Sequence, residues 1–355
     1  MSQNKESNIL ISFVLPTYNV ERYIRNCIES IESQDFQDIG YEIICVEDQS
    51  TDGTRELLES LRNDHLRIIY NQKNSGPSFS RNVGLCEAKG KYVWFVDSDD
   101  LLYPDCIRRG GILKLLEEHR PDALTMRFLK VPEEFAVDAQ FQMEPFPTSF
   151  SWEETLFAAA PIEADTKKTM TTVWGVLFKT ELLRKENLTF DEDMSIGEDT
   201  DFYMFFPRKN VKILRTESIC YLYRQRAGSL LHSSARYRYG YLTNLRILEK
   251  YIRLHSSETQ SGKAQKKSEK AMLANLKYNV AQTLVMVNDR AYVKEQLKIL
   301  REKGYYPFRW NISALKNKRV SVIKRLSLFL LPVYPIFLLI NRQCCKSQNT
   351  HNKLE

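Results

Sequence analysis

The sequence predicts an α/β fold built on a parallel sheet, followed by a mainly helical extension. Across residues 1–130, short apolar runs alternate with segments whose apolar residues recur at helical spacing, which is the pattern of a parallel α/β sheet. From about residue 235 the pattern is helical and increasingly basic. The 355 residues suffice for one large domain or two smaller ones.

The elements of the first part can be placed in order along the chain. Four strands are expected, at residues 11–15, 42–46, 66–70 and 91–96. The helix after the first strand has four apolar residues on one face, Ile24, Cys27, Ile28 and Ile31. A second helix follows the capping groups of residues 50–53, and a third begins near Pro77. In sheets of this kind ligands bind beyond the carboxyl ends of the strands.

Three regions are expected from the changes of pattern. Residues 1–130 form the α/β part. Residues 131–234 belong to the same domain, but the regular alternation fades there and irregular connections begin. Residues 235–355 form a helical, basic extension that contains an apolar segment at 326–340.

The charge of the chain is concentrated at its end. Residues 301–355 contain eleven Lys/Arg and two Asp/Glu, a net +9, whereas the whole chain carries +6. The apolar segment is shorter than the roughly 20 residues of a spanning helix and contains Pro332 and Pro335. It is expected either to contact an anionic membrane surface or to pack on the protein's own core. The polar N-terminus lacks a secretory pattern, so the main body is expected in the cytoplasm, with no nucleic-acid partner.

Three carboxylates follow the fourth predicted strand within four positions. Asp97 and Asp99 would project to the same side if the extended geometry persists, and Asp100 would begin the next turn. Carboxylates this close repel each other, and a bound Mg²⁺ or Mn²⁺ would reverse that balance. Such ions often take one or two protein carboxylates and complete their shell with water and phosphate. The alternative is that the carboxylates only cap a turn.

Other polar residues lie at neighbouring strand ends. Asp48 could accept a hydrogen bond from the N3–H of a uracil ring, or it could serve an Asx turn or cap the next helix. Residues 74–82 form a turn before a helix, where backbone N–H groups and Arg81 could face phosphate. Glu198 and Asp199 open a later helix, where a carboxylate could act as a general base or could simply complement the helix dipole.

The order of these motifs resembles that of family 2 glycosyltransferases, which have the GT-A fold, a Rossmann-like nucleotide-binding sheet with an appended acceptor region. The resemblance covers roughly residues 9–230 and rests on five segments. They are Phe13-Val-Leu-Pro-Thr-Tyr-Asn19, Val46-Glu-Asp-Gln-Ser-Thr-Asp-Gly-Thr54, Asn74-x-Gly-x-x-x-x-Arg-Asn82, Phe95-Val-Asp-Ser-Asp-Asp100 and Gly197-Glu-Asp199. The segment Tyr221-Leu-Tyr-Arg-Gln-Arg-x-Gly-Ser229 resembles one often found in bacterial polysaccharide transferases.

The resemblance implies roles for particular residues. Asp97 and Asp99 would form the D-x-D site for Mn²⁺ or Mg²⁺ and the donor diphosphate, and Asp199, with Glu198 beside it, would supply the base. The regions 1–130 and 131–234 would then hold the nucleotide sugar and the acceptor. The expected donor-binding set is Pro16, Thr17, Tyr18, Asn19, Asp48, Asn74, Gly76, Arg81, Asp97 and Ser98.

The implied reaction moves one sugar with inversion from a nucleotide diphosphate sugar, with UDP favoured, to a glycan or lipid-linked glycan. Trp174 is expected either to stack on an acceptor sugar or to lie buried in the sheet. Glu47 and Gln49 depart from the family pattern, which usually has Asp and Gly there. The chain lacks the Gln-x-x-Arg-Trp motif of processive synthases, which favours transfer of a single sugar.

Two alternatives to this function remain open. A nucleotidyltransferase of sugar phosphates would also use a metal and a nucleoside pocket, but it would need a basic triphosphate loop near the first strand. The sequence there reads Pro-Thr-Tyr-Asn. A non-catalytic sugar-binding homologue would tolerate loss of the base or of the D-x-D motif.

Overall fold

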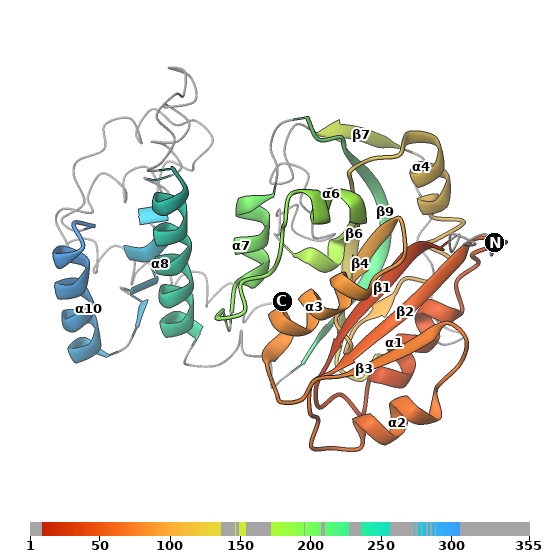
Figure 1. The fold of residues 1–355 in the computed structure, drawn as a ribbon, viewed down its shortest axis with the longest axis horizontal. Helices are drawn as coiled ribbons and strands as arrows, with labels where there is room; N and C mark the ends of the chain where they lie inside the picture. Colours follow the sequence, from red (N-terminus) through yellow and green to blue (C-terminus); the bar gives the residue numbers. More distant parts are fainter. Residues whose placement is uncertain are drawn as a thin grey trace, which may run out of the picture. The chain divides into compact units, whose positions relative to one another are not determined.

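The computed structural model describes residues 9–135, 146, 149–153, 172–194, 196–206, 210–226, 236–255 and, with gaps, 273–305 (Figure 1). The chain divides into two compact units, residues 1–229 and 230–355. The expected region 1–130 lies in the first unit, and the expected region 131–234 extends five residues beyond the boundary of that unit. The apolar segment 326–340 lies outside the described residues.

The first unit is built on one sheet of nine strands. The expected strands are present as β1 (Ile9–Thr17), β2 (Gly40–Glu47), β3 (Leu66–Tyr70) and β4 (Tyr92–Phe95), which pair in parallel in the order β3-β2-β1-β4. The sheet continues beyond β4 as β8 (Val176–Lys179), β6 (Ala123–Pro132), β9 (Ile213–Gln225) and β5 (Leu101–Leu102), with β7 (Phe150–Glu153) also paired to β9.

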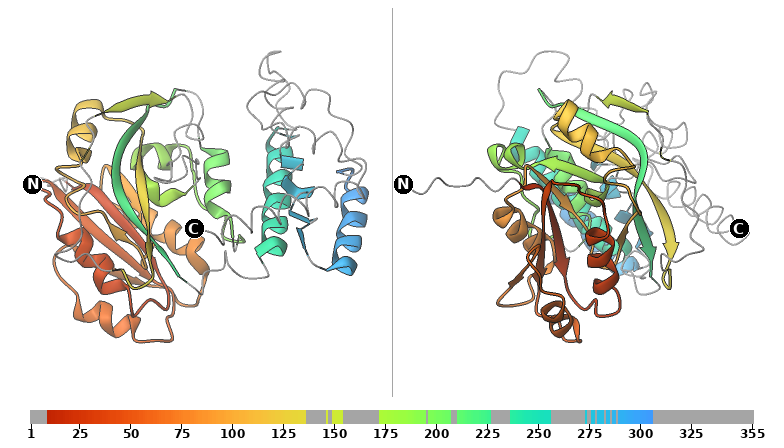
Figure 2. Two further views of the ribbon diagram at one scale, coloured as in Figure 1. Left: turned by 180° about the vertical axis from the view of Figure 1, so that it is seen from behind. Right: turned by 90° about the vertical axis from the view of Figure 1, so that its right-hand side faces the viewer.

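The far half of the sheet is mixed in direction. Strand β8 runs antiparallel to both β4 and β6, whereas β6 and β9 run parallel to each other over most of their length. These two long strands lie side by side (Figure 2). Strand β9 is long enough to pair also with β5, which follows the loop after β4. There Leu101 pairs with Leu222, and Leu102 pairs with Tyr221.

Helices cover both faces of the sheet. On one face lie α1 (Ile24–Glu32), α2 (Thr54–Ser60) and α4 (Ile112–His119), which pack with Phe13 and Trp94. On the other lie α3 (Gly76–Glu87), α6 (Thr180–Lys185) and α7 (Glu198–Phe205), which pack with Val14 and Phe95 (Figure 1). Adjacent residues of one strand thus enter different cores, because side chains alternate across a strand.

The register of the parallel strands brings their carboxyl ends to one edge. Thr17 pairs with Glu47, Glu47 with Tyr70, and Val14 with Phe95. The segments that follow β1, β2 and β4 therefore begin close together. This edge is where open α/β sheets bind ligands.

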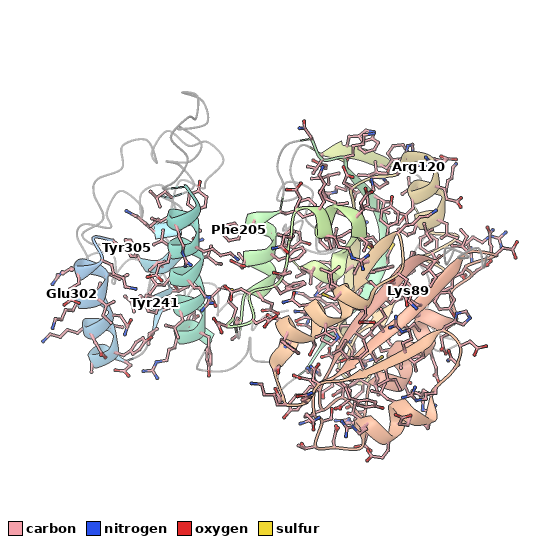
Figure 3. The ribbon with its side chains drawn as sticks, in the orientation of Figure 1. Lys89, Arg120, Phe205, Tyr241, Glu302 and Tyr305 are labelled. Carbon is pink, nitrogen blue, oxygen red and sulfur yellow. The ribbon has the colours of Figure 1, made fainter. Side chains whose placement is uncertain are left out.

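The described part of the second unit is helical, as expected. It contains α8 (Arg236–His255) and α10 (Arg290–Glu302), with Tyr241, Leu248 and Leu300 buried in its interior (Figure 3). Asp289 accepts a hydrogen bond from the Tyr292 N–H and so caps α10. Among the described residues, no helix is both long enough and apolar enough to cross a membrane.

Candidate active site

The segment after β1 is tied to its neighbours by short polar contacts. The Ser98 hydroxyl donates to the Pro16 carbonyl at 2.8 Å, and the Thr17 hydroxyl is buried and donates to the Leu15 carbonyl. Asn19 adopts a left-handed φ of 50°, and its side-chain oxygen accepts from the Thr51 N–H. Tyr18, in contrast, is 44% exposed, which leaves its ring available to a ligand.

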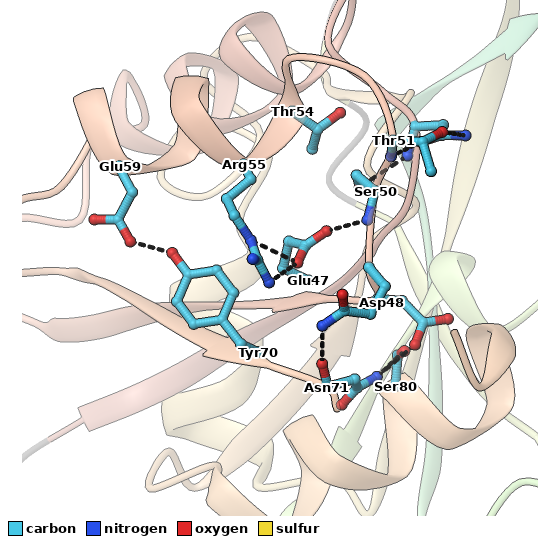
Figure 4. Close-up of polar contacts among 12 residues, drawn as sticks. Glu47, Asp48, Ser50, Thr51, Thr54, Arg55, Glu59, Tyr70, Asn71 and Ser80 are labelled. Atoms are coloured by element: carbon cyan, nitrogen blue, oxygen red, sulfur yellow. Dashed lines mark hydrogen bonds and ion pairs between the residues drawn. The ribbon is translucent and has the colours of Figure 1, made fainter. Parts of the chain in front are cut away.

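Asp48 joins β2 to the start of α3. Its buried carboxylate accepts hydrogen bonds from the Ser75 N–H and the Gly76 N–H. It also accepts from the side-chain amide of Asn71 (Figure 4). Asp48 does not cap the next helix, α2, whose N-cap residue is Gly53; the Asp52 carboxylate accepts from the Thr54 N–H at the start of that helix. Asp48 therefore shapes the turn that contains the exposed Asn74 and the half-buried Gly76.

The two departures from the family pattern have structural explanations. Glu47 is fully buried, and its carboxylate accepts from the Ser50 N–H and from both Nε and Nη2 of Arg55. Gln49 has a φ of 62°, a left-handed conformation that glycine adopts without strain. Its side-chain amide donates to the Asn71 carbonyl, a contact that glycine could not make.

The acidic segment after β4 is a turn. Strand β4 ends at Phe95, and the Asp100 N–H donates to the Asp97 carbonyl. The extended geometry considered for Asp97 and Asp99 therefore does not persist. Instead, Asp97 Oδ1 lies 2.7 Å from Arg81 Nη2, and Asp99 Oδ2 lies 2.6 Å from Arg226 Nε. The Asp100 carboxylate is buried and accepts from the Tyr221 hydroxyl and the Arg224 N–H, so it does shape the turn.

Arg81 connects the turn at residues 97–100, called the acidic turn below, to the acidic pair Glu198 and Asp199. Its Nη1 lies 2.9 Å from Glu198 Oε1 and 3.9 Å from Asp199 Oδ1, while its Nη2 holds Asp97. The residue is only 4% exposed. From the sequence, the Arg81 guanidinium was expected to face phosphate. In the structure it lies against three carboxylates instead. Helix α7 begins after Gly197, whose φ of 83° makes the sharp entry that brings Glu198 and Asp199 to this point.

Asp199 combines burial with an unused hydrogen-bond acceptor. Its Oδ2 accepts from the Val173 N–H at 3.2 Å, but its Oδ1 is buried and accepts no hydrogen bond from the described residues. Burial, reinforced by the negative charge of Glu198, raises the pKa of Asp199 to about 8, although Arg81 opposes the shift. A carboxyl of this pKa exchanges its proton near neutral pH.

Burial also raises the pKa of two carboxyls in the turn. The pKa of Asp99 is raised by desolvation and by Asp97, with Arg226 and Arg224 opposing. The pKa of Asp100 is raised well above its ordinary value by desolvation and by the two neighbouring aspartates. Positive charge added to the turn would lower these pKa values, because it stabilises the ionised form.

Trp174 lies in the core and not on an open surface. It is 3% exposed, and its ring stacks on those of Tyr221 and Tyr223 at centroid distances of 4.4 and 5.3 Å. The interpretation of Trp174 as an acceptor platform is not supported by this position, because its ring is already covered. The alternative was right about burial, but Trp174 lies in the short 3₁₀ helix Val173–Gly175 just before β8 and not in a strand.

The sequence interpretation assigned no role to three residues that complete the site. Tyr221 donates its hydroxyl to Asp100 and accepts the Asp97 N–H, Arg226 pairs with Asp99, and Asn71 donates to Asp48. The signal for Tyr221 and Arg226 was the quoted segment that begins at Tyr221, which lies at the end of β9 and just beyond it. Asn71 carried no signal beyond its place after a strand.

A large cavity of about 1150 Å³ lies elsewhere in the first unit. Its lining includes Leu10 near the start of β1, Lys91 and Tyr92 at the start of β4, Lys179 at the end of β8 and Arg120 just after α4. It is therefore at the edge of the sheet opposite the acidic turn. None of the predicted site residues lines it.

Residues 12–185 match the family model described as Glycosyl transferase family 2. The chain carries a family 2 glycosyltransferase domain. It is 32% identical over 225 residues to the uncharacterized glycosyltransferase EpsJ of Bacillus subtilis, a match that covers 62% of each chain. It is 27% identical over 230 residues to the poly(ribitol-phosphate) beta-N-acetylglucosaminyltransferase TarS of Staphylococcus aureus, covering 64% of this chain and 37% of TarS. The chain thus covers less than two thirds of either relative.

A third relative and a solved structure extend the comparison. The chain is 29% identical over 251 residues to the GalNAc(5)-diNAcBac-PP-undecaprenol beta-1,3-glucosyltransferase of Campylobacter jejuni, covering 69% of this chain and 75% of that one. The crystal structure of S. aureus TarS 1-349 in complex with UDP-GlcNAc superposes with a TM-score of 0.66 at 22% identity, covering 94% of this chain and 92% of that one. The family 2 domain accordingly has the GT-A fold.

The residues of the acidic turn suit a hard divalent cation. Among the described residues no group of three or more His, Cys, Asp or Glu side chains is gathered to hold a metal. Asp97 and Asp99 supply two carboxylates, and Mg²⁺ or Mn²⁺ at a phosphate commonly needs no more from the protein. Both carboxylates are partly open, with side-chain exposures of 29% and 17%.

Proposed function

We propose that this chain transfers one sugar residue from a nucleotide diphosphate sugar to a hydroxyl of a glycan or lipid-linked glycan, with inversion at the anomeric carbon. The observation that carries the proposal is the cluster around Arg81, which joins a D-x-D turn to a buried carboxylate with an unused acceptor oxygen. The cluster lies at the carboxyl edge of a parallel sheet, where a nucleotide would bind.

UDP is the proposed nucleotide of the donor. The exposed ring of Tyr18 would stack on the uracil base. An oxygen of the Asp48 carboxylate would accept a hydrogen bond from the N3–H of the uracil. The turn shaped by Asp48 would present the exposed Asn74 side chain toward the donor. The complex of TarS with UDP-GlcNAc supports this choice through the shared fold.

The residues can perform a direct displacement. Asp199 would take the proton of the acceptor hydroxyl as its oxygen bonds to the anomeric carbon, while the bond from that carbon to the diphosphate breaks. Glu198 and Asp97 hold Arg81, and Arg81 in turn keeps Asp199 oriented. A Mg²⁺ or Mn²⁺ held by Asp97 and Asp99 would supply positive charge to the leaving diphosphate. General-base help contributes about 10² to 10⁴-fold, so positioning and charge must supply the rest.

The acceptor is proposed to be a polysaccharide precursor at the inner membrane face. The Campylobacter relative is named for an undecaprenol-linked acceptor, which supports a lipid-linked substrate. The basic and apolar residues of 301–355 would hold the chain at an anionic surface through charge attraction and apolar contact.

Transfer and slow hydrolysis of UDP-sugars in the presence of Mn²⁺ test this function. We expect Asp199→Asn to reduce kcat by about 10² to 10⁴-fold with little change in UDP affinity, because only the base is lost. Asp97→Asn should weaken the binding of UDP with Mn²⁺. The control is Glu186→Gln, which alters an exposed carboxylate outside the cluster.

Two outcomes would contradict the assignment. If turnover persists in both variants, the sites are wrong. Release of pyrophosphate from UTP and a sugar phosphate would indicate a nucleotidyltransferase, and binding of UDP-sugars without any turnover would indicate a non-catalytic homologue.

A further inference from the structure

The three carboxylates of the acidic turn are each engaged by a group from a distant part of the chain. Asp97 pairs with Arg81 of α3, Asp99 pairs with Arg226 just after β9, and Asp100 accepts from Tyr221. Neighbouring partly buried carboxylates repel one another unless positive charge lies between them. Two guanidinium groups therefore supply the charge that a divalent cation would otherwise bring.

The two arginines are held very differently. The Arg81 side chain is 5% exposed and contacts three carboxylates, so it cannot move without leaving them unpaired. The Arg226 side chain is 34% exposed, and among the described residues it pairs with Asp99 and lies over the Tyr23 ring, 5.4 Å from the centroid. A partly exposed ion pair contributes little to stability. Arg226 is thus the cation that can leave the turn.

Arg226 has a fixed surface to move across. The Tyr23 hydroxyl donates to Glu133 at 2.7 Å, which holds the ring in place. Arg224 lies over the same ring and is anchored by donating to the carbonyls of Asp99, Glu133 and Phe135. Movement of Arg226 would therefore leave its neighbours undisturbed.

We propose that Arg226 takes the place of the divalent cation on Asp99 when no donor is bound, and passes to the diphosphate when the donor and cation bind. The inference rests on the proposed function. Arg226 must leave Asp99 because its charge would otherwise oppose a cation on the same carboxylate. Its planar N–H groups match phosphate oxygens well, so the diphosphate offers it a replacement partner. Arg226 would in this way make the cation and the nucleotide bind cooperatively.

The proposal predicts effects of opposite sign on two affinities. Arg226→Gln should bind Mn²⁺ alone about threefold more tightly than the wild type, because the competing charge is gone. The same variant should bind UDP in metal-free buffer about threefold more weakly, because the diphosphate has lost its guanidinium. Isothermal titration calorimetry measures both affinities on the full chain. A merely structural loss would lower both affinities together.

Two further variants complete the test. Asp99→Asn removes the carboxylate that holds Arg226, so UDP without metal should bind about threefold more tightly than to the wild type. Arg108→Gln is the matched control, since Arg108 pairs with Asp35 on the surface of the same unit, and both affinities should stay unchanged. Asp99→Asn keeps the test valid even if Arg226→Gln fails to fold.

The possible results separate the two proposals. If the wild type binds UDP and Mn²⁺ but neither Arg226→Gln nor Asp99→Asn shifts the affinities as stated, the role of Arg226 is wrong and the proposed function stands. If the wild type binds neither UDP nor Mn²⁺, the proposed function fails, and the role of Arg226 fails with it.

Discussion

Arg81 shows how a single residue can organise a site whose parts are far apart in sequence. It lies on α3, yet it contacts Asp97 after β4 and Glu198 and Asp199 at the start of α7. A buried guanidinium with carboxylates on both of its Nη atoms is satisfied electrostatically, whereas the carboxylates without it would be buried and uncompensated. In the proposed reaction Arg81 is therefore a positioning residue that connects the donor site to the base.

The raised pKa of Asp199 predicts a particular dependence of stability on pH. The pKa in the folded protein is about 8, above the ordinary 3.8, so the folded state binds this proton more tightly than the unfolded state does. This contribution to stability is full below about pH 4 and is lost as the pH rises through 8. We expect the free energy of unfolding to fall with pH across this window, with a slope of at most about 1.4 kcal/mol per pH unit.

Urea unfolding at pH 5, 7 and 9 measures this dependence. Asp199→Asn should lack this part of the slope because its amide does not titrate, and Glu186→Gln should keep it. Equal slopes in the wild type and Asp199→Asn would show that Asp199 does not titrate in the folded protein within this range.

At the scale of the elements, short turns after parallel strands form the nucleotide side of the site. Glu47 at the end of β2 contacts Arg55 (Figure 4). In the turn that follows, Asp48 contacts the start of α3 and Gln49 contacts the Asn71 carbonyl. Each contact spans a different pair of elements. The strands supply the rigid edge, and these three side chains determine the shape of the loops above it.

Gln49 provides a test of that turn because its backbone is left-handed. Gln49→Ala would keep the strained φ of 62° and lose the hydrogen bond to Asn71, whereas Gln49→Gly would lose the bond but relieve the strain. We expect the glycine variant to be about 1 kcal/mol more stable than the alanine variant in urea unfolding. If alanine is equal or better, strain at this position is not what favours glycine.

The sequence was informative about these elements to different degrees. The four parallel strands were predictable because apolar runs and helical spacing are local signals, and the polar residues at their ends were identified with them. The geometry of the acidic turn was not, because an extended strand and a turn place Asp97 and Asp99 differently. Trp174 was ambiguous for the same reason: its burial depends on Tyr221 and Tyr223, which lie far along the chain.

At the scale of the whole molecule, the chain consists of a GT-A unit and a second unit whose described residues are mainly helical. The basic excess belongs to residues 301–355, outside most of the described structure. The function proposed for residues 301–355 is contact with an anionic membrane surface.

Co-sedimentation with lipid vesicles tests the role of this tail. The full chain should sediment with vesicles that contain anionic lipid and much less with neutral ones, and added salt should release it, because charge attraction is screened. A variant ending after Tyr305, which retains α10, should lose most of this binding. Unchanged binding of the shortened chain would assign the membrane contact elsewhere or exclude it.

The sequence by itself determined the α/β class, the parallel strands and the residue types available at their carboxyl ends, because these follow from local periodicity and local chemistry. Only the tertiary structure decided which of those residues act together. Arg81 and Arg226 meet the acidic turn because α3 and β9 converge on the end of β4, and such long-range convergence leaves no periodic trace in sequence. In the turn after β4, one arginine holds Asp97 and another holds Asp99. This arrangement is the basis of the proposal that Arg226 leaves Asp99 for the diphosphate of the donor.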